Sequence, residues 1–154
     1  MSRLTIGAVK AVLILAVAGG VVVQTAVIPT VWADLREVSP AVRLTVVVAC
    51  VGWIACMQLV AACVWRLLTM VSAGSVFSAR AFRPVDVIIG AALVASVLTA
   101  VLATLLVPGD AAPGLVGIVY GLALAIAGVA LIIVVMRALL RQAIEMRSEL
   151  AEVV

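Results

Sequence analysis

Histidine is absent from this sequence, and charged residues make up only 11% of its 154 positions. Histidine is the side chain most often used as a general base and as a metal ligand, and no Cys-x-x-Cys pair is present to replace it. This absence argues against haem, zinc and iron-sulfur sites, and it leaves the serines and threonines with no base to activate them. We therefore expect no catalytic residue, no metal site, no cofactor and no enzymatic activity.

Cysteine is scarce as well, and its three copies, Cys50, Cys56 and Cys63, lie in one apolar stretch. None lies in a loop where an oxidising compartment could pair it with another. We interpret all three as small hydrophobic packing residues.

Hydrophobic residues, in contrast, make up 68% of the chain, and the mean hydropathy is +1.44. A globule of this length has too little interior to hide so much apolar surface, so the solvent must be lipid. Four apolar runs of about 22 residues each can cross a hydrocarbon core of about 30 Å as helices. These runs lack the alternation of polar and apolar residues that is typical of transmembrane barrel strands. The sequence predicts an all-α integral membrane four-helix bundle, a single domain of residues 1–154 with spans at about 11–32, 42–65, 85–107 and 114–136.

Positively charged residues lie mostly on one side of these spans. Only Arg36 and Arg43 lie on the side opposite the N-terminus. Positive charge resists translocation, so we expect both termini in the cytoplasm. The predominance of arginine over lysine suggests a bacterial source, and hence a multi-pass protein of the bacterial cytoplasmic membrane. The eight residues on the N-terminal side are Arg3, Lys10, Arg66, Arg80, Arg83, Arg137, Arg141 and Arg147.

Small residues form stripes in the third and fourth spans. In the third span they recur as pairs every four residues, so they share one helix face, where another backbone can approach closely. The short turn between these spans favours packing of the two helices on each other. The stripes would also suit a dimer interface or a gated seam. The stripe residues are Ala91, Ala95 and Thr99 in the third span and Gly114, Gly117, Gly121 and Gly128 in the fourth.

Two glutamines, Gln24 and Gln58, lie at membrane depth in the first two spans. An amide in hydrocarbon needs a partner, so these side chains either bond across helices or line a small polar cavity. We favour the bond. Pro29 is expected to kink the first span. No Asp, Glu or Arg lies near the centre of a span, which argues against an ion pathway built on buried charge.

Two segments, residues 66–84 and 137–154, are expected on the cytoplasmic side. The first is an internal loop whose beginning can extend the second helix into the interface. The second has the spacing of an amphipathic helix that continues the fourth span. This tail could lie on the membrane, pack under the bundle or bind a partner, and we favour packing under the bundle against the internal loop. Candidate contacts for headgroups or a protein partner are Arg66, Arg80, Arg83 and Arg141.

The internal loop reads Gly74-Ser75-Val76-Phe77-Ser78, and the chain ends in an acidic amphipathic stretch. In these features the chain resembles DUF2975, a family of bacterial four-helix membrane proteins, although Ala79-Arg80-Ala81 stands where members usually carry polar or acidic residues. The resemblance implies no assigned biochemical activity. It also implies a gene that often neighbours a small helix-turn-helix regulator, and thus a membrane component of a regulatory or stress-response pair. The family-motif positions are Gly74, Phe77 and Ser78.

Two functions are consistent with these features. The first is a non-enzymatic sensing, regulatory or scaffolding module that docks a cytoplasmic protein through its loop and tail and contacts no nucleic acid directly. The second is a small oligomeric transporter or pore subunit for a small or lipophilic ligand, with the small-residue stripes as its interfaces.

Overall fold

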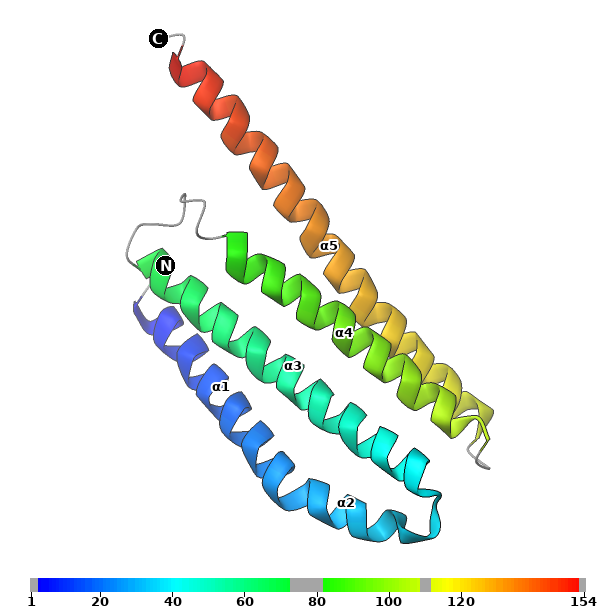
Figure 1. Ribbon diagram of the computed structural model, residues 1–154. Helices are drawn as coiled ribbons and strands as arrows, with labels where there is room; N and C mark the ends of the chain where they lie inside the picture. Colours follow the sequence, from blue (N-terminus) through cyan, green and yellow to red (C-terminus); the bar gives the residue numbers. More distant parts are fainter. Residues whose placement is uncertain (1–2, 73–81, 109–111, 153–154) are drawn as a thin grey trace.

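The protein is a helical membrane protein in the computed structural model, which describes residues 3–72, 82–108 and 112–152 (Figure 1). Four helices in these ranges are long and apolar enough to cross a membrane, and no strand occurs there. The predicted all-α four-helix architecture is confirmed. The candidate spans cover Ile6–Glu37, Pro40–Met70, Arg83–Leu106 and Pro113–Gln142.

The long helices lie side by side in chain order (Figure 1). They are α1 (Arg3–Val22), α3 (Pro40–Ser72), α4 (Phe82–Leu106) and α5 (Pro113–Glu152). Helix α4 packs extensively on both α3 and α5, whereas the main contact of α1 is with α3. Short connections explain this order, because they make sequence neighbours into spatial neighbours. Helices α1 and α5 thus form the two edges of the molecule and make no extensive contact with each other.

The first span is interrupted near its middle. Helix α1 leads into a π-helical turn (Val23–Val27), then α2 (Ile28–Asp34), then a 3-10 turn (Leu35–Glu37). Pro29 has no amide hydrogen and its ring crowds the preceding turn, so the backbone widens there. The amide of Ile28 accordingly donates to the carbonyl of Val23, five residues back. The expected kink is confirmed as a bend between α1 and α2 (Figure 1).

The ends of the long helices show where the predicted internal loop is helical. Prolines begin α3 and α5 at Pro40 and Pro113, as expected for residues that have no amide to leave unsatisfied. However, α3 continues to Ser72 and α4 already begins at Phe82. The beginning of the segment 66–84 thus extends the preceding helix, as expected, because the residues after Arg66 are apolar.

The interior between the helices is built almost entirely from alanine. On α4, the predicted stripe of Ala91, Ala95 and Thr99 is buried and continues to Ala103. Small side chains let the backbones approach closely, which is how helices gain packing energy in lipid. Close packing of this stripe is confirmed. The other buried alanines are Ala49 and Ala61 on α3 and Ala123 and Ala130 on α5.

The prediction that the glycine stripe of α5 packs on α4 within the chain is wrong. Gly114, Gly117, Gly121 and Gly128 face open space, since no heavy atom lies within 4 Å of a Cβ built at any of them. Helix α5 instead packs on α4 through a face carrying Ala123 and Ala130. At about 100° of turn per residue, this alanine face lies opposite the glycine face. Both faces carry small residues, so the sequence does not show which of them is buried against α4.

Candidate functional site

The two intramembrane glutamines bond to each other. The Nε2 of Gln58 donates to the Oε1 of Gln24 at 3.3 Å, which joins α3 to the π-helical turn. The predicted interhelical bond is confirmed. The neighbouring Gly20 permits it, because a Cβ there would lie 3.0 Å from the Nε2 of Gln58 and 3.2 Å from the Cγ2 of Ile54. The close approach of α1 to α3 therefore depends on a position without a side chain.

The hydroxyl groups of α4 are also used in packing. The Oγ of Ser96 donates to the carbonyl of Ala123 at 2.8 Å, which links α4 to α5. The buried Oγ1 of Thr99 donates to the carbonyl of Ala95 at 2.7 Å, within its own helix. A hydroxyl bonded in this way adds no exposed polar surface in hydrocarbon. These groups satisfy backbone carbonyls instead of lining a polar pathway.

An ion pair that the sequence analysis missed fastens α5 to α4. The Nη2 of Arg137 lies 2.7 Å from the Oδ2 of Asp86, and the two side chains are 34% and 47% exposed. Asp86 belongs to the first turns of α4 and Arg137 to the second half of α5. The sequence could have indicated this pair, because antiparallel packing brings the start of the third span beside the end of the fourth.

Substitutions at Asp86 and Arg137 should reveal how much this ion pair contributes to the stability of the protein. We expect Asp86→Asn to lower the free energy of unfolding by about 0.2–1 kcal/mol, the range of partly exposed ion pairs. Asp86→Arg should cost more, because it places two guanidinium groups together. Adding Arg137→Asp to Asp86→Arg should restore stability. Thermal unfolding in detergent, with Arg83→Gln as a control, measures each effect, and a double variant less stable than Asp86→Arg alone would contradict the pairing.

Three of the four candidate arginines lie in the part of the chain that the structure describes. Arg66, Arg83 and Arg141 are exposed. They belong to three different helices, α3, α4 and α5, so packing brings them to the same end of the molecule. Arg80 and the family-motif positions Gly74, Phe77 and Ser78 lie outside the described residues.

Two cations stack on indole rings at opposite ends of α3, one between α1 and α3 and the other between α2 and α3. The Nζ of Lys10 lies 5.1 Å from the ring centroid of Trp65, and the Cζ of Arg43 lies 3.9 Å from that of Trp32. Tryptophan is enriched at both membrane interfaces, where its ring can meet a charged side chain at the edge of the hydrocarbon. Both contacts are of the kind found at the membrane interfaces.

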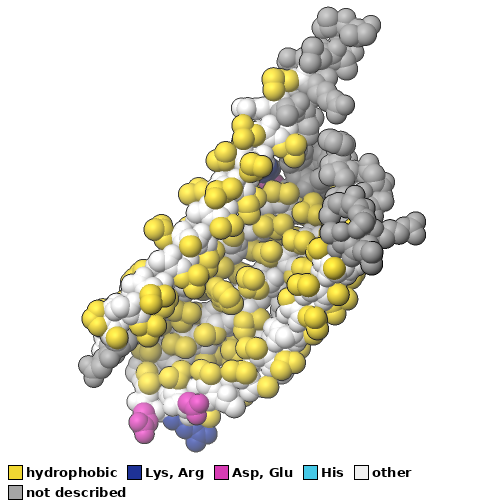
Figure 2. All heavy atoms as spheres, turned by 180° about the vertical axis from the view of Figure 1, so that it is seen from behind, with side chains coloured by type: hydrophobic (Ala, Val, Ile, Leu, Met, Phe, Trp, Pro, Cys, Tyr) yellow, Lys and Arg dark blue, Asp and Glu magenta, His cyan; other side chains and the backbone are white. Residues whose placement is uncertain are grey.

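Three mainly apolar hollows flank α1, α2 or the π-helical turn between them, and none of the three has a charged lining residue. The largest, of about 410 Å³, lies between α2, α3, α4 and α5 and includes Cys50. A second of about 350 Å³ and a third of about 320 Å³ lie between α1 and α3. All three cysteines are free and half-buried, and the described residues include no cluster of potential metal ligands. Figure 2 shows one face of the molecule, where hydrophobic side chains predominate and charged ones are visible mainly at the lower end.

The C-terminal tail continues α5 and extends beyond the other helices (Figure 1). A helical continuation of the fourth span was expected, and the helix to Glu152 confirms it. The expected packing of its apolar face under the bundle is wrong for the side chains that the structure describes. Leu139, Leu140 and Met146 are 55%, 52% and 60% exposed. The C-terminal part of this 40-residue helix extends past the ends of its neighbours (Figure 1).

No curated protein and no solved structure matches the chain. The DUF2975 family model, described as a protein of unknown function, matches residues 30–154. The match begins in α2 and includes α3, α4, α5 and the three motif positions. Since it covers well over half of the sequence, this chain belongs to the DUF2975 family.

Proposed function

We propose that this protein is a non-enzymatic membrane module with a sensing, regulatory or scaffolding role, and that it docks a cytoplasmic protein through the C-terminal part of α5. The observation that supports this proposal is the exposed apolar face of α5 beyond Arg137, formed by Leu139, Leu140 and Met146. At about 1.5 Å per residue, a 40-residue helix is about 60 Å long, twice the thickness of a hydrocarbon core. A helix of this length would therefore extend beyond the hydrocarbon at its C-terminal end.

The charge distribution supports a cytoplasmic position for this tail. Eight of the ten Lys and Arg residues flank the membrane on the side of both termini. Positive residues are retained on the cytoplasmic side during insertion. In a bacterial cytoplasmic membrane, the tail would then meet cytoplasmic proteins.

An amphipathic helix with an exposed apolar face suits a partner that offers an apolar groove. Apolar side chains exposed to water favour burial, and anchors of this kind dominate the free energy of many interfaces. The ion pair between Arg137 and Asp86 would hold the base of the tail against α4. The partner would therefore meet a helix in a defined position.

Photo-crosslinking in intact cells tests this proposal. A photoreactive residue at Leu139, Leu140 or Met146 should yield the same discrete adduct with one soluble cytoplasmic protein. The same residue at Ile118 or Leu124, which are exposed on α5 at membrane depth, should yield none. Capture of a cytoplasmic protein would also establish the sidedness of the tail.

Charged substitutions in the apolar face of the tail should reduce this crosslinking. With the photoreactive residue at Leu140, the pair Leu139→Asp and Met146→Asp should lower the adduct yield about tenfold or more, because interface anchors are lost. These side chains are exposed, so the membrane helices should remain folded. Adducts limited to lipid or to other copies of the chain would contradict the proposal.

One observation favours the second candidate, an oligomeric transporter or pore subunit. The glycine face of α5 has open space beside it, and a glycine face of this kind allows close approach of another helix in lipid. The paired glutamines oppose this candidate, because their amides are occupied by each other. A monomeric protein in lipid nanodiscs that conducts no solute into liposomes would eliminate it.

A further inference from the structure

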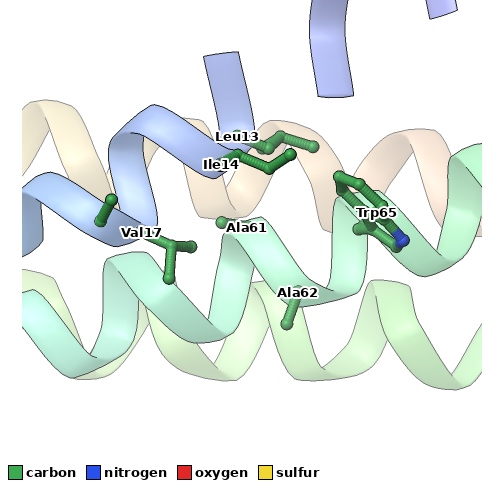
Figure 3. Close-up of a pocket in the computed structure, with 7 residues that line it drawn as sticks. Leu13, Ile14, Val17, Ala61, Ala62 and Trp65 are labelled. Atoms are coloured by element: carbon green, nitrogen blue, oxygen red, sulfur yellow. The ribbon is translucent and has the colours of Figure 1, made fainter. Parts of the chain in front are cut away.

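The hollow between α1 and α3 nearest the N-terminal end has a purely apolar lining (Figure 3). It measures about 350 Å³, within the range of roughly 300–1,000 Å³ that is typical of small-ligand sites. The small side chains of Ala61 and Ala62 form its floor. They are faced by Leu13, Ile14 and Val17 of α1. Its chemistry suits a hydrocarbon chain.

The same hollow has a cationic end. Trp65 lies at one end of the lining in Figure 3, and the Nζ of Lys10 lies 5.1 Å from its ring centroid. Lys10 precedes Leu13 and Ile14 by three and four residues, which places it one turn further along the same face of α1. Lys10 has no salt-bridge partner among the residues that the structure describes.

A second cation belongs to the same end. Arg66 follows Ala62 by four residues on α3 and is exposed, so it lies one turn beyond the floor of the hollow. An apolar hollow bounded at one end by Lys10 and Arg66 is complementary to a molecule that is apolar along its length and anionic at one end. No acidic residue lines the hollow to repel such a molecule.

We propose that this hollow binds one acyl chain of an anionic phospholipid, whose phosphate is held by Lys10 and Arg66 beside the indole of Trp65. Lipid chains are as apolar as leucine, so the apolar lining alone cannot choose among lipids. The choice arises from the headgroup charge, since each cation near an anionic headgroup favours binding about fivefold. This site is independent of the docking role of α5.

Fluorescence quenching by brominated lipids tests the site. Substituting Trp32→Phe and Trp53→Phe leaves Trp65 as the sole tryptophan of the three. In phosphatidylcholine vesicles, brominated phosphatidylglycerol should quench Trp65 more strongly than the same mole fraction of brominated phosphatidylcholine. We expect Lys10→Gln or Arg66→Gln each to lower this preference about fivefold.

Arg43→Gln is the matched control, because Arg43 is also a cation beside an aromatic position, Trp32 in the wild-type chain, but it lies at the end of α3 opposite to the hollow. It should leave the preference at Trp65 unchanged. Ala62→Leu, at an exposed position, should fill the hollow and weaken quenching by both lipids. Equal quenching by the two lipids, or equal effects of Lys10→Gln and Arg43→Gln, would overturn the proposal.

Native mass spectrometry gives a second measurement that needs no tryptophan substitution. The full chain, released from an equimolar mixture of the two lipids, should retain phosphatidylglycerol in preference to phosphatidylcholine. Lys10→Gln should reduce that excess about fivefold, and Arg43→Gln should leave one preferentially bound phosphatidylglycerol. Retention without preference in the wild-type protein would also overturn the proposal.

Discussion

Replacing Gly20 with leucine should separate α1 from α3 and lower the free energy of unfolding by about 1–3 kcal/mol, the usual cost of overpacking. A Cβ at this position would lie 3.0 Å from the Nε2 of Gln58 and 3.2 Å from the Cγ2 of Ile54. The glutamine can move only by losing its bond to Gln24, and the branched isoleucine is stiff. The effect should be large because α3 provides most of the packing surface of α1.

The adjacent Gly19→Leu is the control for this prediction. No heavy atom lies within 4 Å of a Cβ at Gly19, so a side chain there should point into lipid. We expect the free energy of unfolding not to fall and to rise by up to about 1 kcal/mol, because glycine is a poor helix former. Unfolding in mixed detergent micelles measures both variants, and equal destabilisation by the two substitutions would show that α1 does not pack as described.

The hydrogen bond between Gln24 and Gln58 should contribute less to the free energy of unfolding than the close approach of α1 to α3 at Gly20. Gln58→Leu should cost about 0.6 kcal/mol, typical of interhelical hydrogen bonds in membranes. In a double-mutant cycle, Gly20→Ala and Gln58→Leu should cost less together than the sum of their separate effects, because both break the same bond.

The second large effect is expected on the opposite side of the bundle, where Ala130→Leu should force α5 away from α4. Ala130 is 0% exposed, so a larger side chain has no space unless the helices separate. We expect a loss of about 1–3 kcal/mol in the free energy of unfolding. Ala103→Leu should behave similarly, because Ala103 is also 0% exposed on α4. Unfolding in detergent micelles, compared with the wild-type chain, measures both losses.

Gly121→Leu is the matched control on the same helix. Its Cβ would meet no heavy atom within 4 Å, so the stability of the monomer should not fall. If Gly121→Leu cost as much as Ala130→Leu, the orientation of α5 would be the reverse of the one described. A change in oligomeric state without a change in monomer stability would instead assign the glycine face to contacts between copies.

Patterns that repeat along one helix predicted much of this structure. The repeat of four from Ala91 to Thr99 predicted a close-packed face, because any helix with that spacing places those residues on one side. Pro29 predicted a bend, because the missing amide is a property of the residue itself. Gln24 and Gln58 predicted their mutual bond, since amides in hydrocarbon seek partners and these two lie on neighbouring spans.

Choices between two similar faces could not be predicted in the same way. Helix α5 has glycines on one face and alanines on the other, and both are small enough to pack. The alanine face meets α4 because Ser96 bonds to the carbonyl of Ala123 and because the neighbouring helices fit there. Similarly, Asp86 and Arg137 are 51 residues apart, and their pairing depends on the register of α4 against α5.

The sequence by itself determined that this chain crosses a membrane four times as helices, because apolar length and backbone hydrogen bonding leave no other solution in lipid. It also determined membership of the DUF2975 family, since the match over residues 30–154 is a property of the residues alone. Only the tertiary structure decided which small-residue face is buried, that the tail beyond Arg137 exposes its apolar side chains, and that Lys10 meets Trp65 beside an apolar hollow. These features depend on the rotation and register of one helix against another. Van der Waals packing selects both, and neither is contained in the periodicity of a single helix.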